Sequence, residues 1–187
     1  MVNLIFVLFS GLFFINAKEL TLEGVKETAL KVTKEFEKRL KKELKNAKRV
    51  GGTKAMIDFC INDSKKIQED INKKYGPNIS IKRVSLNYRN EKAKPKDNEI
   101  KILKAFDLIQ QSDAYEPEQI VQIVDDNKYK VYSAIQMNSR DCKKCHGLDK
   151  NVDKNTKKRF SEVYKNDRGY GHKSGDVRGA VVVTVSK

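Results

Sequence analysis

The stretch Cys142-Lys143-Lys144-Cys145-His146 decides how the rest of this sequence is interpreted, because it reads C-x-x-C-H. This pattern is the attachment signature of a c-type haem, in which two thiols bond to the vinyl groups and the adjacent imidazole ligates the iron. A redox-active dithiol is disfavoured because the pair does not open a helix after a strand in an α/β unit. A zinc site is disfavoured because no second C-x-x-C or His pair exists to complete it. The sequence therefore predicts one covalent haem c held by Cys142, Cys145 and His146.

The N-terminus indicates export. Residues 1–17 are uncharged and rich in Leu, Phe, Val and Ile, and they end Ile15-Asn16-Ala17 before Lys18, which is typical of a signal peptide cleaved after Ala17. An uncleaved N-terminal anchor is the alternative, although the run is shorter than the ~20 residues of a spanning helix. Because bacterial haem attachment to C-x-x-C-H follows export, both signals predict a periplasmic protein.

The remaining residues, 18–187, are enough for one domain with its own core, and no long linker divides them. Charged residues make up 34% of the chain, and the net charge is +14. In an exported protein this charge does not indicate a nucleic-acid partner. Lys and Glu alternate along the chain as on solvated helix faces. A basic surface that contacts an acidic redox partner or a membrane surface is the alternative.

Hydrophobic periodicity predicts helices in the first half of the chain. Apolar residues recur at steps of three and four from Leu22 to Lys48, and Gly51-Gly52 ends this pattern. A second helix from Thr53 to about Lys74 is expected to pack against the first as an antiparallel pair. Further helices are predicted over 97–111 and 156–166, and strands over 79–88, 119–124, 129–136 and 177–185.

These elements predict an α+β fold. The helical part covers about residues 20–75, and the sheet part, mainly antiparallel, covers about residues 79–187. A curved sheet of this kind offers a pocket that suits a haem. The all-helical fold of small cytochromes c is disfavoured because their C-x-x-C-H lies near the start of the chain.

Cys60 is the third cysteine, and it has no disulfide partner once the other two bind haem. It lies on a predicted apolar helix face with Met56 and Phe59. Two interpretations stay open, a small buried hydrophobic residue and an iron ligand. The alternatives for the sixth iron position are Met56, Met137, His172 or an open site. Met137 is expected in the core, and His172 is expected in an exposed loop between Gly171 and Lys173.

Four segments together resemble the PAS-like single-haem c-type domain family, long described as a domain of unknown function. Its members occur alone or at the extracytoplasmic front of histidine kinases. The resemblance covers roughly residues 20–185, with Glu91 where the family often has Pro and His172 where an aromatic residue is usual. The matching segments are Ala55 to Cys60, Ser85 to Asn90, Cys142 to Gly147 and Gly175 to Ala180.

The resemblance implies a PAS-like sheet with a helical N-terminal extension, and an iron ligated by His146 on one side and Cys60 on the other. Haem propionates require cationic or hydrogen-bonding partners, and Tyr88, Arg89 and Arg178 in the matched segments are the candidates. Surface salt bridges are the alternative role for the two arginines.

Two functions follow from these predictions. The first is a redox or ligand sensor module that reports to an unknown signalling protein. The second is a periplasmic electron-transfer cytochrome c with an unknown redox partner. An enzyme is not expected, because peroxidase chemistry needs a distal acid–base His and an open iron.

Overall fold

The structure is a computed structural model that describes residues 20–112 and 118–187. The predicted signal peptide, residues 1–17, lies outside the described residues. None of the helices that the structure describes has the length and apolar character needed to cross a membrane.

Helix α1, Leu22–Asn62, is a long helix with a sharp kink. The Thr21 side chain caps its start by accepting a hydrogen bond from the Gly24 N–H at 3.2 Å. Gly52 adopts φ 62°, a left-handed conformation that favours glycine. The predicted break at Gly51-Gly52 is therefore confirmed. The chain before the kink, residues 22–50, is called the first limb below, and residues 53–62 are called the second limb.

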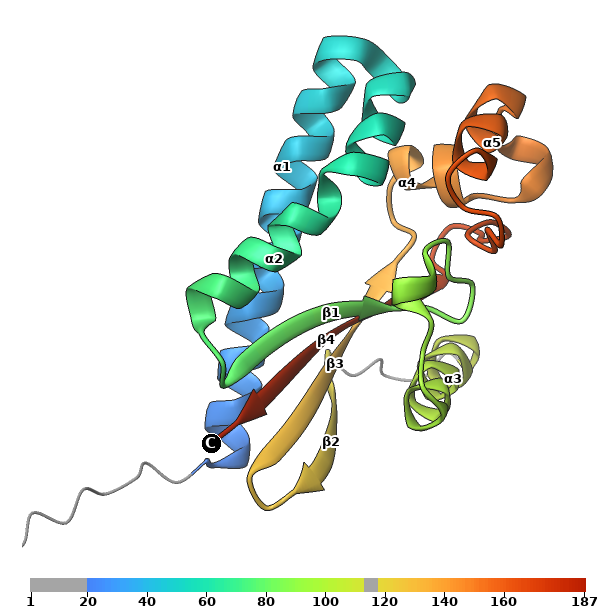
Figure 1. Ribbon diagram of the computed structural model, residues 1–187. Coiled ribbons are helices and arrows are strands. Elements are labelled where there is room, and N and C mark those ends of the chain that lie inside the picture. The colour runs from blue at the N-terminus through green and yellow to red at the C-terminus, as the bar shows by residue number, and fades with distance from the viewer. Residues whose placement is uncertain (1–19, 113–117) are drawn as a thin grey trace, which may run out of the picture.

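Helix α2, Ser64–Tyr75, continues the second limb after an interruption that the sequence did not predict. The interruption lies at Asp63, and the Ser64 hydroxyl there donates to the carbonyl of Cys60 at 2.8 Å. Salt bridges Arg39–Asp70 and Lys74–Glu35 join α2 to the first limb in opposite chain directions. The predicted antiparallel helical pair is therefore confirmed, and it stands at one side of the sheet (Figure 1).

A four-stranded antiparallel sheet forms the other half of the fold. Its order is β1-β4-β3-β2, with β1 at Ile79–Val84, β2 at Ile120–Asp125, β3 at Lys128–Gln136 and β4 at Val177–Ser186. Strand β1 ends four residues before the predicted Tyr88, because the Ser85 N–H bonds to the carbonyl of Ala93 in the short 3-10 turn Glu91–Ala93 instead of to β4.

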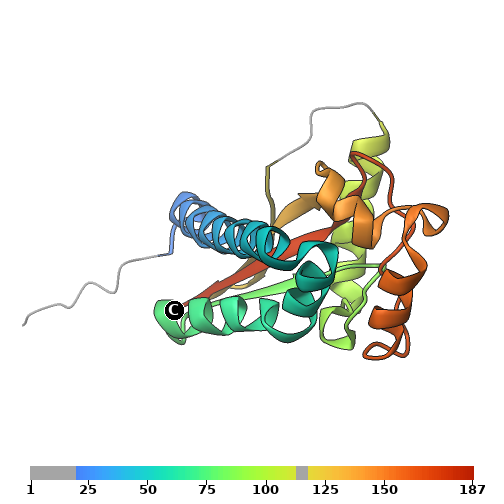
Figure 2. The same ribbon diagram turned by 90° about the horizontal axis from the view of Figure 1, so that it is seen from above.

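The central strand β4 separates two apolar cores. Its residues 181, 183 and 185 pack with the first limb and α2, whereas residues 180 and 182 pack with Leu103 and Phe106 of helix α3, Asp97–Gln111. The helical pair and α3 therefore cover opposite faces of the sheet (Figure 2). The predicted α+β class and the predicted helix over 97–111 are confirmed.

Two polar contacts fasten helices to the sheet. Glu99 near the start of α3 is fully buried, and its carboxylate lies 2.7 Å from Lys82 on β1 and 3.4 Å from Lys130 on β3. The Asn72 amide of α2 accepts from the Ile81 N–H at 2.6 Å and donates to the Ile81 carbonyl at 3.3 Å. The side chain of Asn72 thus bonds the backbone of β1 as a neighbouring strand would.

The segment between β3 and β4 lies beyond one end of the sheet, near the second limb (Figure 1). It contains helix α4, Arg140–His146, a 3-10 turn at Asp149–Asn151 and helix α5, Lys154–Ser161. The last helix was predicted at 156–166. It begins two residues earlier, because the Asp153 carboxylate caps the N–H groups of Asn155 and Thr156, and it ends five residues earlier, at Ser161. Four segments distant in the sequence meet here: the second limb, α4, α5 and the chain after β1.

Candidate functional site

Helix α4 carries the whole C-x-x-C-H motif. The Ser139 hydroxyl caps its start by accepting from the Asp141 N–H at 3.2 Å. Gly147 ends it, and a Cβ atom there would lie only 2.5 Å from the Lys143 carbonyl oxygen. Lys48 at the end of the first limb contacts both carboxylate oxygens of Asp141 at 2.8 Å. The motif is therefore a single capped helical unit tied to α1.

The structure brings Cys60 to the two cysteines of the motif. All three are free thiols, and Cys145 packs against Ile57 of the second limb and Phe160 of α5. Burial raises the pKa of Cys145 to about 11, and the nearby Cys60 adds to this shift. Burial also raises the pKa of the Cys60 thiol, while the positive charges of Arg83 and Arg89 oppose the increase. Cys145 is thus buried, Cys60 and Cys142 are half-buried, and the three thiols lie close enough for their charges to interact.

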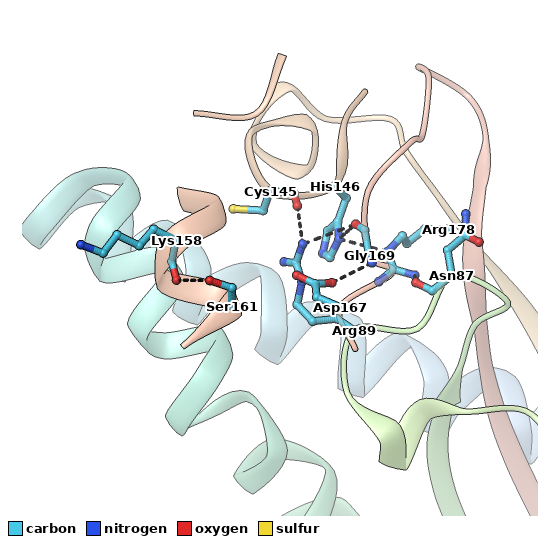
Figure 3. A network of polar contacts seen from close by, with 9 residues as sticks. All are labelled: Asn87, Arg89, Cys145, His146, Lys158, Ser161, Asp167, Gly169 and Arg178. Atoms are coloured by element: carbon cyan, nitrogen blue, oxygen red, sulfur yellow. Dashed lines mark hydrogen bonds and ion pairs between the residues drawn. The ribbon is translucent and has the colours of Figure 1, made fainter. Parts of the chain in front are cut away.

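The His146 ring is oriented through Nδ1, which has two competing partners. Nδ1 lies 2.7 Å from the carbonyl oxygen of Gly169 and 3.1 Å from Nε of Arg178 (Figure 3). The carbonyl requires a hydrogen on Nδ1 and the guanidinium requires a bare nitrogen, so one tautomer satisfies only one of them. Burial, Arg178 and Arg89 hold the pKa of His146 well below its ordinary value. The lowered pKa favours the neutral ring, and the tautomer that donates to Gly169 leaves a lone pair on Nε2.

Arg89 is buried directly beneath this motif. Its Nε contacts the Asp167 carboxylate at 2.9 and 3.0 Å, and its Nη2 donates to the Cys145 carbonyl at 2.7 Å (Figure 3). The guanidinium carbon lies 3.6 Å from the ring centroid of Phe160 and 4.8 Å from that of Tyr170. Arg89 is therefore engaged by protein groups and supports α4. Its predicted contact with a cofactor stays a prediction.

Tyr88 and Arg178 lie in the same region as Arg89. Tyr88 is buried, its carbonyl accepts from the Arg168 N–H, and its ring lies 5.3 Å from the Arg168 guanidinium carbon. Arg178 at the start of β4 donates to the Ser85 hydroxyl and to the Asn87 carbonyl. Of the two, only Arg178 contacts an expected iron ligand directly. Their predicted propionate contacts also stay predictions.

Arg83 is a residue that the sequence reasoning missed. It lies on β1, with its guanidinium carbon 5.5 Å from the Phe36 ring centroid and its Nη2 3.5 Å from the Ser64 hydroxyl. Its charge acts on the Cys60 thiol, which is 23 positions away in the sequence. A lone Arg in a strand carries no spacing signal, so only the folded arrangement reveals the contact.

The expectation for His172 was wrong, whereas the expectation for Met137 is confirmed. His172 is only 7% exposed, because its N–H bonds to the His146 carbonyl and Gly171 bonds to Gly147. This short parallel bridge fixes His172 against the end of α4. Met137 is buried, as expected. Among the residues that the structure describes, no group of three or more His, Cys, Asp or Glu side chains could hold a metal ion by itself.

Comparisons with known proteins agree with this fold. The family model described as Tll0287-like matches residues 17–186. A solved structure titled "Crystal structure of the cyanobacterial heme-protein Tll0287" is 20% identical in sequence and superposes with a TM-score of 0.63. That match covers 90% of this chain and 98% of the cyanobacterial chain. No curated protein matches the chain. At this identity the structural likeness shows a shared fold.

Proposed function

The chain belongs to the Tll0287-like family, and from that premise we propose that it is a periplasmic protein with one covalent haem c and a redox- or ligand-sensing role. The observation that carries the proposal is the convergence of Cys142, Cys145 and His146 on one capped helix, beside the otherwise unpaired thiol of Cys60. The haem protein named in the structural match supports the same cofactor.

The residues of the site fit a covalently bound haem. Cys142 and Cys145 are free thiols on one helix, and His146 follows them with Nδ1 held and Nε2 available. Apolar side chains of the second limb and α5, which include Ile57 and Phe160, pack with the Cys145 thiol, and the half-buried Tyr164 packs against them. An apolar wall of this kind suits a macrocycle and excludes water from the metal.

We propose His146 and Cys60 as the two axial ligands. The carbonyl of Gly169 fixes the orientation of the His146 ring, and fixing one ring nitrogen is the usual way in which a ligating His is positioned. Cys60 approaches from the second limb, a separate element. Met56 shares that limb and Met137 is packed in the core, while His172 contacts His146 from the backbone side. An open site is the remaining alternative.

The arrangement of α1 supports a sensing role. When bound, the haem supplies a one-electron redox couple, and an anionic thiolate favours the ferric state. Cys60 lies near the end of a limb only ten residues long, with the glycine kink before it and the Asp63 interruption after it. Release of the Cys60 sulfur would therefore free a short segment with a hinge at each end. We propose that this segment transmits the redox state to the rest of the PAS-like domain.

An electron-transfer cytochrome is the second candidate, and the net charge of +14 favours it because a basic surface attracts an acidic redox partner or a membrane. A carrier keeps the same two ligands in both redox states. Optical spectra of the oxidised and reduced protein, with carbon monoxide added to the reduced form, separate the two functions. Unchanged ligation and no carbon monoxide binding after reduction would favour the carrier. An enzymatic role is not proposed.

Haem attachment is tested by expression in a periplasm that contains haem-maturation machinery, followed by a denaturing gel with haem staining. We expect one stained band for the wild type, and none for the variant with Cys142→Ala and Cys145→Ala. Cell fractionation should find both proteins in the periplasm. A full-length, exported wild-type protein without stain would end the proposal.

Cys60 ligation is tested with Cys60→Ala. We expect this variant to stain like the wild type, but to show a changed ferric spectrum and to bind small ligands at the iron. Met56→Ala on the same limb is the matched control, and its ferric spectrum should stay unchanged. Identical ferric optical and EPR spectra for Cys60→Ala and the wild type would show that Cys60 only packs.

A further inference from the structure

Three arginines meet behind the proposed haem site, and they have one carboxylate between them. Burial lowers the pKa of Arg178 to about 9, and the positive charges of Arg89 and Arg83 contribute to this shift. Burial likewise lowers the pKa of Arg83. Asp167 is the carboxylate of the group, and it pairs with Arg89. Arg83 and Arg178 are half-buried, and neither forms a salt bridge within the described residues, so both guanidinium groups can still bind an anion.

Arg89 does not need a further anion. Its Nε is satisfied by Asp167, and its Nη2 by the Cys145 carbonyl. Its guanidinium is enclosed by the rings of Phe160 and Tyr170. No further carboxylate is required to balance the Arg89 charge.

Arg178 does need an anion. Its Nη1 has neutral acceptors at Ser85 and Asn87, and its Nε points at His146 Nδ1. That last contact is lost when Nδ1 carries the hydrogen that it donates to Gly169, which is the tautomer required for ligation through Nε2. No salt bridge of Arg178 occurs in the described ranges 20–112 and 118–187.

Arg83 likewise has no salt bridge among the residues that the structure describes. Its one polar contact within the described chain is to the Ser64 hydroxyl at 3.5 Å, which is longer than a typical hydrogen bond. Its flat face covers Phe36, and its charge acts on Cys60. One anion-deficient guanidinium therefore lies near each proposed axial ligand, Arg83 by Cys60 and Arg178 by His146.

We propose that Arg83 and Arg178 each bind one propionate carboxylate of the haem. The inference rests on the proposed function, since the propionates arrive only with the cofactor. The two negative charges of the propionates balance the two unpaired guanidinium charges, and a guanidinium binds a carboxylate with two parallel hydrogen bonds. This assigns a role to Arg83 and limits Arg89 to supporting α4.

The test uses the haem-loaded full chain with Arg83→Gln and Arg178→Gln, and Arg168→Gln as the control that removes the same charge at an exposed position. Haem staining comes first, because attachment through Cys142 and Cys145 does not depend on either arginine. Resonance Raman spectra then report the propionate bending modes, and a redox titration reports the ratio of ferric to ferrous protein.

Each Gln variant should stain normally and show shifted propionate modes. At the wild-type midpoint potential, each should also raise the ratio of ferric to ferrous protein about tenfold, equivalent to about 59 mV for one electron. Arg168→Gln should change that ratio less than about twofold, because an exposed charge is screened. Should a Gln variant fail to accumulate, the corresponding Lys variant is measured instead. Lys retains the positive charge, so the ratio of ferric to ferrous protein should stay at the wild-type value. Lys cannot form the two parallel hydrogen bonds to a carboxylate, so the propionate bending modes should still shift.

Unchanged propionate modes in a stained Arg83 or Arg178 variant would overturn the assignment for that residue. A wild-type protein that attaches no haem would instead overturn the proposed function. The two failures are thus distinguished by the first gel.

Discussion

Replacing Asp167 with Asn removes the negative charge that balances Arg89 while it preserves the shape of the side chain. The two side chains are only 8% and 7% exposed, so the Arg89 guanidinium is left as a buried, unpaired cation. Breaking a buried ion pair on one side costs about 3–5 kcal/mol. The nearby charges of Arg83 and Arg178 place this variant at the upper end of that range. For a chain of this length the melting temperature should fall by roughly 6–20 °C.

The measurement is guanidinium chloride unfolding of the haem-loaded protein, followed by far-UV circular dichroism. Asp70→Asn is the matched control, because it makes the same substitution in another Asp–Arg pair whose Asp side chain is 60% exposed. That surface pair should contribute less than about 1 kcal/mol. The contrast between the two variants isolates the effect of burial.

A double variant, Asp167→Asn with Arg89→Met, separates the charge from the packing. Removal of both partners eliminates the unpaired cation, so we expect more than half of the lost stability to return. The remaining loss should be about 1–2 kcal/mol, since the Cys145 carbonyl no longer has its donor. A free energy of unfolding for Asp167→Asn within about 1 kcal/mol of that for Asp70→Asn would refute this reasoning.

Further predictions concern the sheet and α4. Gly179→Ala should destabilise the fold by more than about 3 kcal/mol in the same assay, because its Cβ would clash with the backbone carbonyl oxygen of Val84 and its φ is 157°. Gly76→Ala, with a φ of 77° but open space around it, should cost only about 1–2 kcal/mol. Glu99 should make stability fall in acid: burial acts to raise its pKa, but Lys82, the Lys96 N–H and Lys130 hold it below the ordinary 4.5. A carboxylate with a lowered pKa stabilises the fold above its unfolded pKa and loses this contribution as the pH falls, so Glu99→Gln should flatten the stability curve between about pH 5 and pH 3; an equally steep curve in the variant would contradict the assignment. Ser139→Ala should reduce stability by about 1 kcal/mol through loss of the cap on α4, and an unchanged unfolding midpoint would show that the cap contributes nothing.

The sequence predicted the parts of the fold that have a local cause. The apolar repeat from Leu22 onward identified the first limb, Gly51-Gly52 identified the kink, and the pattern over 97–111 identified α3. The interruption at Asp63 was missed because Ser64-Lys65-Lys66 fits a continuing helix. Strand β1 was predicted too long because the residues after Val84 favour strands, whereas their hydrogen-bond partners come from Ala93 and β4.

The candidate site also contains residues that the sequence could predict and residues that only the tertiary fold reveals. The C-x-x-C-H motif specifies its own chemistry locally, and the odd cysteine count drew attention to Cys60. Arg83 has no local signature, and its importance depends on the packing of strand β1 against α2 and the first limb. His172 has flanking residues typical of an exposed loop, yet a bridge to Gly147 buries it. Long-range contacts of this kind are formed by the tertiary fold and have no pattern in a single sequence.

The Asn72 side chain has a consequence for self-association. A four-stranded open sheet has two edge strands, β1 and β2, and either could recruit a strand from another molecule. At β1, the Asn72 amide already occupies both backbone groups of Ile81. At β2, Ile123 and Val124 are 68% and 44% exposed. In the described part of the chain, no side chain bonds the outer backbone groups of β2 as Asn72 bonds those of Ile81. A fibril needs two open edges per molecule, whereas one open edge permits only pairs. We therefore expect β2 to be the edge that recruits a second copy, and we expect a chain without the Asn72 amide to expose Ile81 of β1 as well.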